Sequence, residues 1–380
     1  EKEVIKRLVQ VLQREGMLKV LRKGFDLYNV PIKMAFFKPA SGLNPEAQKK
    51  YEQNILTVTR QVRYSTRNEN SLDMVLAVNG LPVATVELKN HFTGQTVEHA
   101  KWQYKHDRDP NELLFQFKKR ALVHFAVDPD EVYMTTRLNG NLTHFLPFNR
   151  GFNKGAGNPP DEETGFRTSY LWRDIWQRDS WLDILHRFLH LQVEEKVEGG
   201  KKIRKETIIF PRFHQLDAVR KIEADVLQNG PGHNYLIQHS AGSGKTNTIA
   251  WLAHRLSSLH DRDNKPIFHS VIVITDRIVL DRQLQDTIYQ FEHVQGVVHP
   301  IKDNSKQLAK ALNSGAKIII TTLQKFGYIL DQVGDMSGKN FALIVDEAHS
   351  SQTGKAADAI KQVLAAPTLE EAEKLQAQLD

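Results

Sequence analysis

The sequence predicts an α/β protein in which an N-terminal α+β domain precedes a domain built on a parallel sheet. In the first half, short β-branched runs flank Asn79-Gly80, a dipeptide typical of a tight β-hairpin. In the second half, continuous apolar strands alternate with helical patterns, which is typical of a parallel sheet covered on both faces. The 380 residues suffice for two or three domains with cores of their own.

The N-terminal part combines helices with strands. Apolar residues at helical spacing predict helices over 1–24, broken at Gly16 and Gly24, and over 97–109. Strands are predicted at 55–65, 73–78, 81–89, 122–128 and 131–136. A tryptophan-containing helical region then continues to the end of the first domain, which we place at residues 1–195.

The C-terminal part is predicted to follow a linker. The stretch 196–209 is basic, contains glycine and has no apolar period, so we interpret it as the connection between domains. Residues 210–380 form the second predicted domain. Its parallel strands are predicted at 234–238, 270–275, 317–322 and 341–346.

The composition excludes several classes of protein. Hydrophobic residues make up 40% and charged residues 25%, as in ordinary globular proteins. No apolar run approaches 18 residues and no signal peptide is visible, so we expect no membrane span and a cytoplasmic location. The absence of cysteine excludes disulfides and thiolate metal sites. The net charge of +6 is compatible with a polyanionic partner.

The stretch 239-HSAGSGKT-246 predicts a phosphate-binding loop. It matches G-x-x-x-x-G-K-[ST] except at its first position, and a predicted strand and helix flank it. Gly242, Ser243 and Gly244 would present backbone N–H groups to an anion at a helix N-terminus. Lys245 would reach the β and γ phosphates of ATP, and the Thr246 hydroxyl would bind Mg²⁺. These flanks disfavour a mere Gly-Ser turn.

A second acidic motif, 346-DEAH-349, follows the last predicted strand. An acid at the carboxyl end of a buried parallel strand lies where such sheets bind ligands. Asp346 is therefore predicted to hold Mg²⁺, and Glu347 to be a catalytic residue that polarises the attacking water. The alternative is a pair of acids placed against a helix dipole, which the phosphate loop makes less favoured.

Together these motifs resemble the superfamily-2 helicase and translocase motors. The stretch 210-FPRFHQLDAV-219 is similar to the segment that precedes such motors, and the resemblance implies that Gln215 binds the adenine of ATP. The stretches 274-ITDRIVLDRQL-284 and 321-TTLQKF-326 resemble motifs that touch DNA in this class. The resemblance implies a RecA-like fold for this domain. His239 is the departure from the pattern.

A different charge pattern occurs in 83-VATVELKNHF-92, where an apolar strand ends in Glu87 and Lys89. Residues two apart on a strand share a face, so both side chains project together while Leu88 packs behind them. With Asp73 upstream, this is the PD-(D/E)xK nuclease constellation. Asp73 and Glu87 would bind Mg²⁺ through oxygen, and Lys89 would assist in catalysis. Taken alone, Glu-x-Lys is more often a surface ion pair.

The register of the hairpin decides whether the two carboxylates can meet. A regular two-residue turn at Asn79-Gly80 would pair Asp73 with Val86, on the face away from Glu87. A three-residue loop over 78–80 would instead set Asp73 diagonal to Glu87. We therefore predict that loop, or an equivalent bulge.

The combination of this nuclease pattern with the motor resembles the R subunit of type I restriction enzymes. The stretches 55-ILTVTRQVRYS-65, 86-VELKN-90 and 346-DEAHSSQTG-354 each resemble that family. The resemblance implies double-stranded DNA as substrate, ATP and Mg²⁺ as cofactors, and M (modification) and S (specificity) subunits as partners. The Gln-x-x-x-Tyr element of many such nucleases does not align here, which leaves a role for Gln103 or Tyr104 open.

Two alternatives remain at this point. One is a helicase-nuclease of DNA repair, with the same chemistry and different partners. The other is a DNA motor whose N-terminal domain is only a docking module. Both ends of the chain look cut, and residues 350–380 contain no arginine. We therefore expect this chain to carry the first motor domain without the second, whose arginines complete ATP hydrolysis in such motors.

Overall fold

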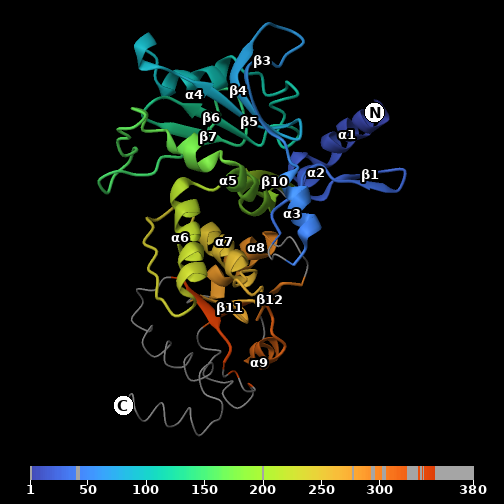
Figure 1. Cartoon of the computed structure of the whole chain (residues 1–380), viewed down its shortest axis with the longest axis vertical. Coiled ribbons are helices and arrows are strands. Elements are labelled where there is room, and N and C mark those ends of the chain that lie inside the picture. The colour runs from blue at the N-terminus through green and yellow to red at the C-terminus, as the bar shows by residue number, and fades with distance from the viewer. Residues whose placement is uncertain are drawn as a thin grey trace. The chain divides into compact units, whose positions relative to one another are not determined.

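Two compact units make up the chain, residues 1–214 and 215–380. The computed structural model in Figure 1 describes residues 2–39, 43–198, 201–275, 278–291, 296–301, 305–322, 333, 336 and 338–346. The boundary between the units falls in the first turn of α6 (Phe213–Asn229). Among the described residues, none of the helices combines the length and the hydropathy needed to cross a bilayer.

A six-stranded mixed sheet forms the centre of the N-terminal unit, with strand order β3-β4-β5-β6-β7-β8. Its strands are β3 (Leu56–Arg63), β4 (Ser71–Val78), β5 (Leu81–Leu88), β6 (Val123–Val127), β7 (Val132–Thr135) and β8 (Leu146–Pro147). Only β5 and β6 pair in parallel. A parallel pair needs a crossover, and the chain supplies it through η1 (His91–Thr93) and α4 (Val97–His106). The predicted strands and the helix of this sheet are thus confirmed.

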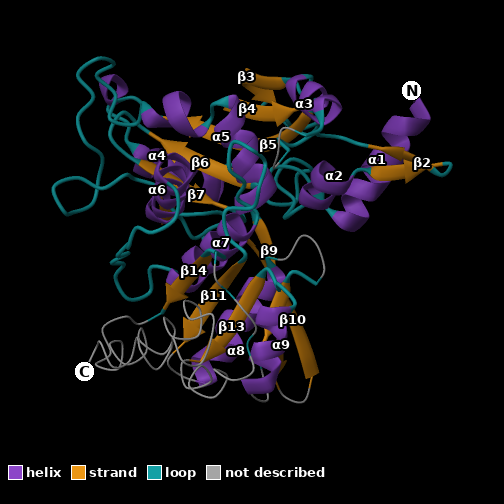
Figure 2. Ribbon diagram, turned by 60° about the horizontal axis from the view of Figure 1, so that its bottom comes forward, coloured by secondary structure: helices purple, strands orange, loops and turns teal. Residues whose placement is uncertain are grey.

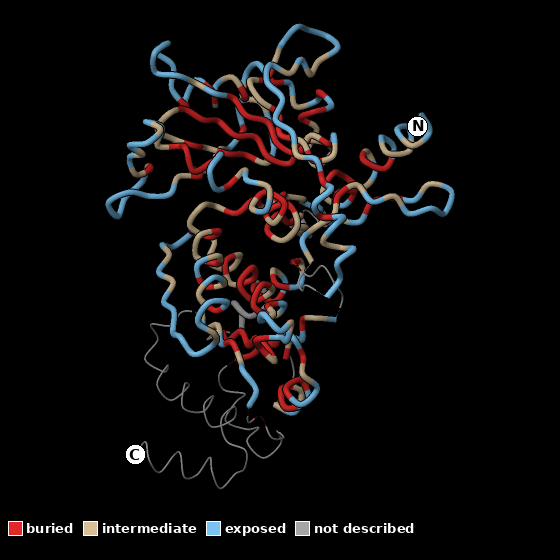
Figure 3. Tube along the Cα trace, viewed as in Figure 1, coloured by how far each residue is buried: buried red, intermediate tan, exposed pale blue. Residues whose placement is uncertain are grey.

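The face of the sheet that α4 covers is an apolar core. Ala100 and Tyr104 of α4 pack with Val75 of β4 and Ala126 of β6, and all four are buried. Figure 3 shows the same burial as red stretches along the central strands. The functional side chains described below lie at the end of this face, where β5 leaves the sheet.

The remaining elements of this unit surround the sheet. They are α1 (Lys2–Glu15), α2 (Met17–Lys23), β1 (Phe25–Leu27), β2 (Val30–Ile32), α3 (Pro45–Glu52), η2 (Leu171–Ile175), α5 (Arg178–Asp183) and η3 (Ile184–Phe188). The predicted breaks at Gly16 and Gly24 are confirmed, since both glycines flank α2 with positive φ. A Cβ on Gly24 would lie 2.0 Å from the Ile32 carbonyl oxygen, so this position requires glycine.

The predicted linker is a β-hairpin and not an irregular connection. β9 (His190–Glu198) pairs antiparallel with β10 (Lys201–Ile209) along its whole length, from His190 opposite Ile209 to Glu198 opposite Lys201. The prediction was wrong because a two-stranded ribbon exposes both faces and so needs no apolar period. Its opposite charges instead face each other across the ribbon, as Arg204 faces Glu195.

A four-stranded parallel sheet organises the C-terminal unit, with order β12-β13-β11-β14. Figure 2 shows β13, β11 and β14 of this sheet. Its strands are β11 (Ser270–Thr275), β12 (Val298–Pro300), β13 (Ile318–Thr322) and β14 (Phe341–Val345). Among the described residues, the helices after α6 are α7 (Lys245–Ser257), α8 (Ile278–Gln290) and α9 (Ser305–Asn313). The predicted parallel sheet is confirmed, although β12 was missed because it is short and ends in proline.

One predicted strand is wrong. Residues 234–238 form no regular secondary structure, and Leu236 is 84% exposed. A strand needs a neighbour for its N–H and C=O groups, and among the described residues no ladder includes this segment. The short apolar run was therefore a misleading sign of a strand, because this segment has no neighbouring strand with which to pair among the described residues.

Candidate functional site

The hairpin between β4 and β5 sets the geometry of the first site. Asn79 and Gly80 both have positive φ, and Val78 pairs with Leu81, so the turn has two residues. The predicted three-residue loop is therefore wrong. The predicted alternative, a bulge, is confirmed: Ala77 pairs with Pro82, but Leu76 pairs with Ala84. Proline has no N–H for the ladder, which makes Pro82 a suitable residue beside a bulge.

The bulge brings the two predicted carboxylates to one face. Beyond it, Met74 pairs with Val86, so the next residues in register are Asp73 and Glu87. They therefore lie directly opposite each other. The three-residue loop would have placed them diagonally. Asp73 Oδ2 also accepts a hydrogen bond of 2.8 Å from the Leu88 amide. The carboxylate of β4 is thereby fixed to the end of β5.

Glu87 is a buried carboxylate with a perturbed pKa. It is 1% exposed, and its Oε1 accepts a hydrogen bond of 2.7 Å from Nε of Arg108 and forms an ion pair of 2.6 Å with Nη2. Burial raises the pKa of Glu87 to about 7; the Arg108 charge opposes this shift, and Asp73 adds to it. Two crowded carboxylates, one of them in a low-dielectric setting, form a site that favours a cation.

Lys89 points to the same region from the end of β5. Its Nζ donates a 2.6 Å hydrogen bond to Oε1 of Gln103 on α4. Leu88 between the two charged residues is 41% exposed, so the expectation that it packs behind them is wrong. Tyr104 is fully buried and bonds to the Thr85 hydroxyl at 2.8 Å. Of the two residues left open, Gln103 contacts the lysine and Tyr104 belongs to the core.

Gln61 on β3 adds a third strand to the site. Its amide nitrogen donates to Asp73 Oδ1 at 3.2 Å. Its φ of 51° is uncommon for a residue other than glycine and costs about 1–3 kcal/mol. Such strain persists only where surrounding contacts hold it, and it is concentrated at functional sites. No pattern in the sequence pointed to this residue, because glutamine is common in strands.

Arg108 was also missed. It follows α4 and precedes a turn-rich segment, so no period or motif distinguishes it from the exposed charges around it. In the structure it is 3% exposed and paired with Glu87. The only usable signal was indirect: a buried glutamate needs a partner, and an arginine is the most suitable one.

The phosphate loop has the backbone that its glycines predict. Gly242 and Gly244 have φ values of 72° and 85°, and α7 begins directly after them at Lys245. Thr246 is the second residue of that helix. The φ of 85° at Gly244 is a backbone conformation that L side chains rarely adopt, so this position favours glycine. The loop therefore meets the helix N-terminus as an anion site does.

Gln215 braces this loop. Its side chain is 3% exposed, and its Nε2 donates to the carbonyl oxygens of Gly244 at 2.9 Å and Ser243 at 3.3 Å. The sequence predicted contact with adenine, which stays a prediction. The contact that the structure adds is to the backbone of the phosphate loop itself.

Asp346 comes directly after β14, at the carboxyl edge of the parallel sheet. Its amide donates to the Ile274 carbonyl oxygen at 3.0 Å, near the end of β11. This is the edge at which α/β sheets bind ligands. Glu347 lies outside the described residues, as do 276–277 and 323–326 of the two predicted DNA-contacting motifs.

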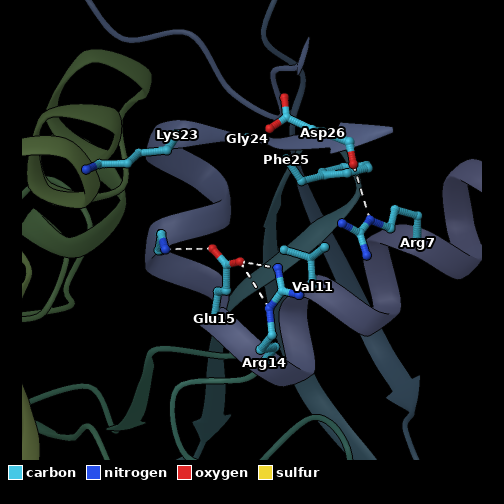
Figure 4. A pocket seen from close by; sticks show the side chains of 9 residues that line it. Arg7, Val11, Arg14, Glu15, Lys23, Gly24, Phe25 and Asp26 are labelled. Atoms are coloured by element: carbon cyan, nitrogen blue, oxygen red, sulfur yellow. Dashed lines mark hydrogen bonds and ion pairs between the residues drawn. The ribbon is translucent and has the colours of Figure 1, made fainter. Parts of the chain in front are cut away.

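Two further features lie away from these sites. His91, Asp128 and Asp130 offer ligand atoms within 4.8 Å of one another. Asp128, however, already accepts hydrogen bonds from the amides of Val97, Asp130 and Glu131, so loop and helix capping explain its position. A hollow beside α1, α2 and β1 is lined by charged residues that pair among themselves, such as Arg14 with Glu15 (Figure 4).

Comparison with known proteins identifies similar regions in both units. A family model described as "Type I restriction enzyme R protein N terminus" matches residues 38–142. A model described as "SWI2/SNF2 ATPase" matches residues 214–369. The first match covers the strands that carry Asp73, Glu87 and Lys89, and the second covers the phosphate loop.

Individual relatives are similar across both units. They include a protein of Methanocaldococcus jannaschii provisionally named as the MjaVIIIP endonuclease subunit of a type I restriction enzyme (24% identity over 348 residues). The type I restriction enzyme SauMSSORF170P endonuclease subunit of Staphylococcus aureus is 26% identical over 329 residues. Each match covers 83% of this chain and 31% of the relative. The HindI endonuclease subunit of Haemophilus influenzae is 25% identical, over 74% of this chain and 26% of its own length. The chain thus spans about a third of these relatives' length.

Proposed function

We propose that this chain belongs to the R-protein family of type I restriction enzymes, and that it couples ATP-driven translocation of double-stranded DNA to metal-dependent endonucleolytic cleavage. The match of residues 38–142 supports the nuclease, and the SWI2/SNF2 match supports ATP use. In this proposal residues 1–195 carry cleavage and 210–380 carry the first RecA-like motor domain.

The observation that carries the nuclease proposal is the pairing of Asp73 with Glu87. The β5 bulge brings Asp73 and Glu87 into register on one face, and Lys89 follows two residues after Glu87, with its Nζ bonded to Gln103. The residues fit Mg²⁺, because its preferred ligands are carboxylate oxygens, and burial together with the neighbouring Asp73 raises the pKa of Glu87, a shift that a bound cation would oppose. Bound by Asp73 and Glu87, Mg²⁺ would supply Lewis-acid activation of water and neutralise charge on the scissile phosphate. Lys89, held by Gln103, would orient that phosphate or the attacking water.

The motor proposal assigns a role to each residue of the second site. Lys245 and the backbone of Gly242, Ser243 and Gly244 would hold the phosphates of ATP, supported by the positive φ of the two glycines. Thr246 and Asp346 would hold Mg²⁺, and Glu347 would orient the attacking water. Gln215 would contact adenine. Because its side chain also bonds the loop carbonyl oxygens, adenine binding would then affect the conformation of the phosphate loop.

The proposal also covers partners and location. Curated relatives are named as subunits of restriction enzymes, which supports a multisubunit assembly acting on DNA. We propose M and S subunits as the partners, with the S subunit selecting the DNA sequence, and a cytoplasmic location. The first alternative, a repair helicase-nuclease, differs from this proposal in its partners. The second, a motor with a docking domain, differs because its N-terminal domain would not cleave DNA.

An Asp73→Asn variant tests the nuclease function. In the chain assembled with M and S subunits, we expect cleavage of DNA to fall at least about 100-fold, because a neutral amide binds Mg²⁺ poorly, while DNA-stimulated ATP hydrolysis is retained. Gel analysis of circular DNA and a phosphate-release assay measure the two activities.

Asp26→Asn is the matched control, since Asp26 is an exposed aspartate on β1 of the same unit. If Asp73→Asn cleaves DNA as fast as Asp26→Asn, the result would favour the docking-domain alternative. Failure of the chain to copurify with M and S subunits would favour the repair alternative.

A further inference from the structure

Arg108 is a buried arginine anchored at three points around the proposed nuclease site. Its Nε donates to Glu87 Oε1 at 2.7 Å, and its Nη2 forms an ion pair with the same oxygen at 2.6 Å. Nη2 also donates to the Ser71 carbonyl oxygen at 2.9 Å, and Nη1 to the Tyr64 hydroxyl at 3.3 Å. With both Arg108 and Glu87 nearly inaccessible to water, the pair is fixed by its surroundings.

Through these contacts, Arg108 links the two strands that carry the carboxylates. Ser71 lies two residues before Asp73 on β4, while Glu87 lies on β5. The guanidinium therefore connects the backbone of the strand that carries one carboxylate to the side chain of the other. Both contacts with Arg108 end on Oε1, and the Glu87 carboxyl also meets the Asp73 carboxyl, so Oε2 is the oxygen that the arginine leaves for a cation shared with Asp73.

We propose that Arg108 is a positioning residue for the nuclease metal site, which fixes Glu87 through Oε1 so that Oε2 is presented beside Asp73. The inference rests on the proposed nuclease function. A terminal carboxylate torsion is broad, and repulsion from Asp73 would turn Glu87 away if nothing held it. A planar guanidinium supplies two donors in fixed geometry, which a lysine cannot do.

Charge and orientation act in opposite directions at this site. The positive charge of Arg108 repels a nearby cation, so a purely electrostatic role would weaken metal binding. Orientation of the ligand strengthens it, and loss of such outer partners typically weakens metal binding about 10–100-fold. Arg108→Lys keeps the charge and removes the fork, and so isolates the orientation effect.

Binding of Mn²⁺ alone to the whole chain tests the proposal directly. The electron paramagnetic resonance signal of free Mn²⁺ reports how much metal the chain binds, and the signal lost with Asp73→Asn defines the nuclease site. We expect Arg108→Lys to weaken this Asp73-dependent binding about 10–100-fold. Arg108→Gln, which retains a planar donor but not the charge, should weaken it as well.

Arg22→Lys is the matched control, because Arg22 is a half-buried arginine of the same unit whose guanidinium bonds only carbonyl oxygens, those of Leu185 and Leu189, among the contacts described. Near-ultraviolet circular dichroism verifies folding. Where both Arg108 variants misfold, Tyr64→Phe removes one anchor of the guanidinium and should weaken binding severalfold.

Three outcomes separate the ideas. Binding weakened in the Arg108 variants and unchanged in Arg22→Lys supports the positioning role. Asp73-dependent binding that is unchanged in folded Arg108 variants, or equally weakened in Arg22→Lys, overturns it and leaves the nuclease proposal intact. A wild-type chain with no Asp73-dependent Mn²⁺ binding instead contradicts the nuclease proposal itself.

Discussion

At the scale of single residues, the environment of the β5 face decides which groups are charged. Glu87 and His124 are both buried there, within one layer of the sheet. Burial disfavours the charged form of each, so it raises the pKa of the carboxyl and lowers that of the imidazole. Glu87 has an arginine to offset this effect, whereas His124 bonds the neutral Thr85 hydroxyl at 2.8 Å.

His124 should make the stability of the fold depend on pH. Burial lowers its pKa from 6.5 to about 3, so below pH 6.5 the unfolded chain binds a proton that the folded chain does not. The stabilisation is complete above pH 6.5 and is lost as the pH falls toward 3. Between pH 7 and pH 5 we expect this group to lower the free energy of unfolding by about 2 kcal/mol. Guanidinium unfolding at both pH values measures it.

The comparison with His124→Gln isolates this effect. All other titrating groups are common to the two proteins, so the difference between their pH dependences belongs to His124. Equal losses of unfolding free energy in both proteins would show that His124 is protonated in the fold.

At the scale of elements, pairing decides what a segment becomes. The basic segment predicted as a linker is stable as β10 because β9 pairs with it and the unit anchors it. Lys118 forms an ion pair with Glu206, and the Thr136 hydroxyl donates to the Ile208 carbonyl oxygen at 2.8 Å. A two-stranded ribbon is marginal alone, so these anchors matter. Residues 234–238 lack such a partner among the described strands and stay irregular.

Limited trypsin digestion should distinguish a hairpin from a linker. A protease needs a locally unfolded segment, so cleavage after Arg204 or Lys205 in β10 requires the ribbon to open. We expect these cuts to be about tenfold or more slower than cleavage after Lys154, which lies in an exposed loop of the same unit. Mass spectrometry of the digest over time gives both rates. A first cut at Arg204 or Lys205 would be the behaviour of a flexible linker.

At the scale of the whole molecule, the two proposed sites lie in different compact units. The residues proposed for cleavage fall within 1–214, and those proposed for ATP binding fall within 215–380. Each unit has its own sheet and its own core cluster. Separate cores allow a substitution at one site to leave the other folded.

Paired lysine substitutions test this separation. Lys89→Ala should abolish cleavage by the assembled enzyme and spare ATP hydrolysis, because it removes a charge from the nuclease site alone. Lys245→Ala should abolish hydrolysis by removing the phosphate-binding charge, and it should also stop cleavage if cutting depends on translocation. Both activities are measured on both variants. Loss of ATP hydrolysis in folded Lys89→Ala would contradict separate sites.

The sequence by itself determined the features that local chemistry specifies. The hairpin turn follows from Asn79-Gly80, the phosphate loop from its glycines and Lys245, and the parallel sheet from its continuous apolar strands, because these depend on neighbours in the chain. The sequence also predicted that Asp73 and Glu87 could meet only through a change in the register of the hairpin. The tertiary structure decided that this change is a bulge beside Pro82 and not a longer turn, because the bulge keeps the apolar residues of β4 and β5 on the core faces of the sheet.

Only the tertiary structure identified Arg108 and Gln61 as neighbours of the carboxylates. They come from a turn after α4 and from an edge strand, and neither carries a local pattern. The same holds for the contact of Gln215 with the loop, which joins residues 28 and 29 positions apart. The physical reason is common to all three. Burial creates the need for a partner, and which side chain meets that need depends on the packing of distant elements, which the spacing of residues along the chain does not encode.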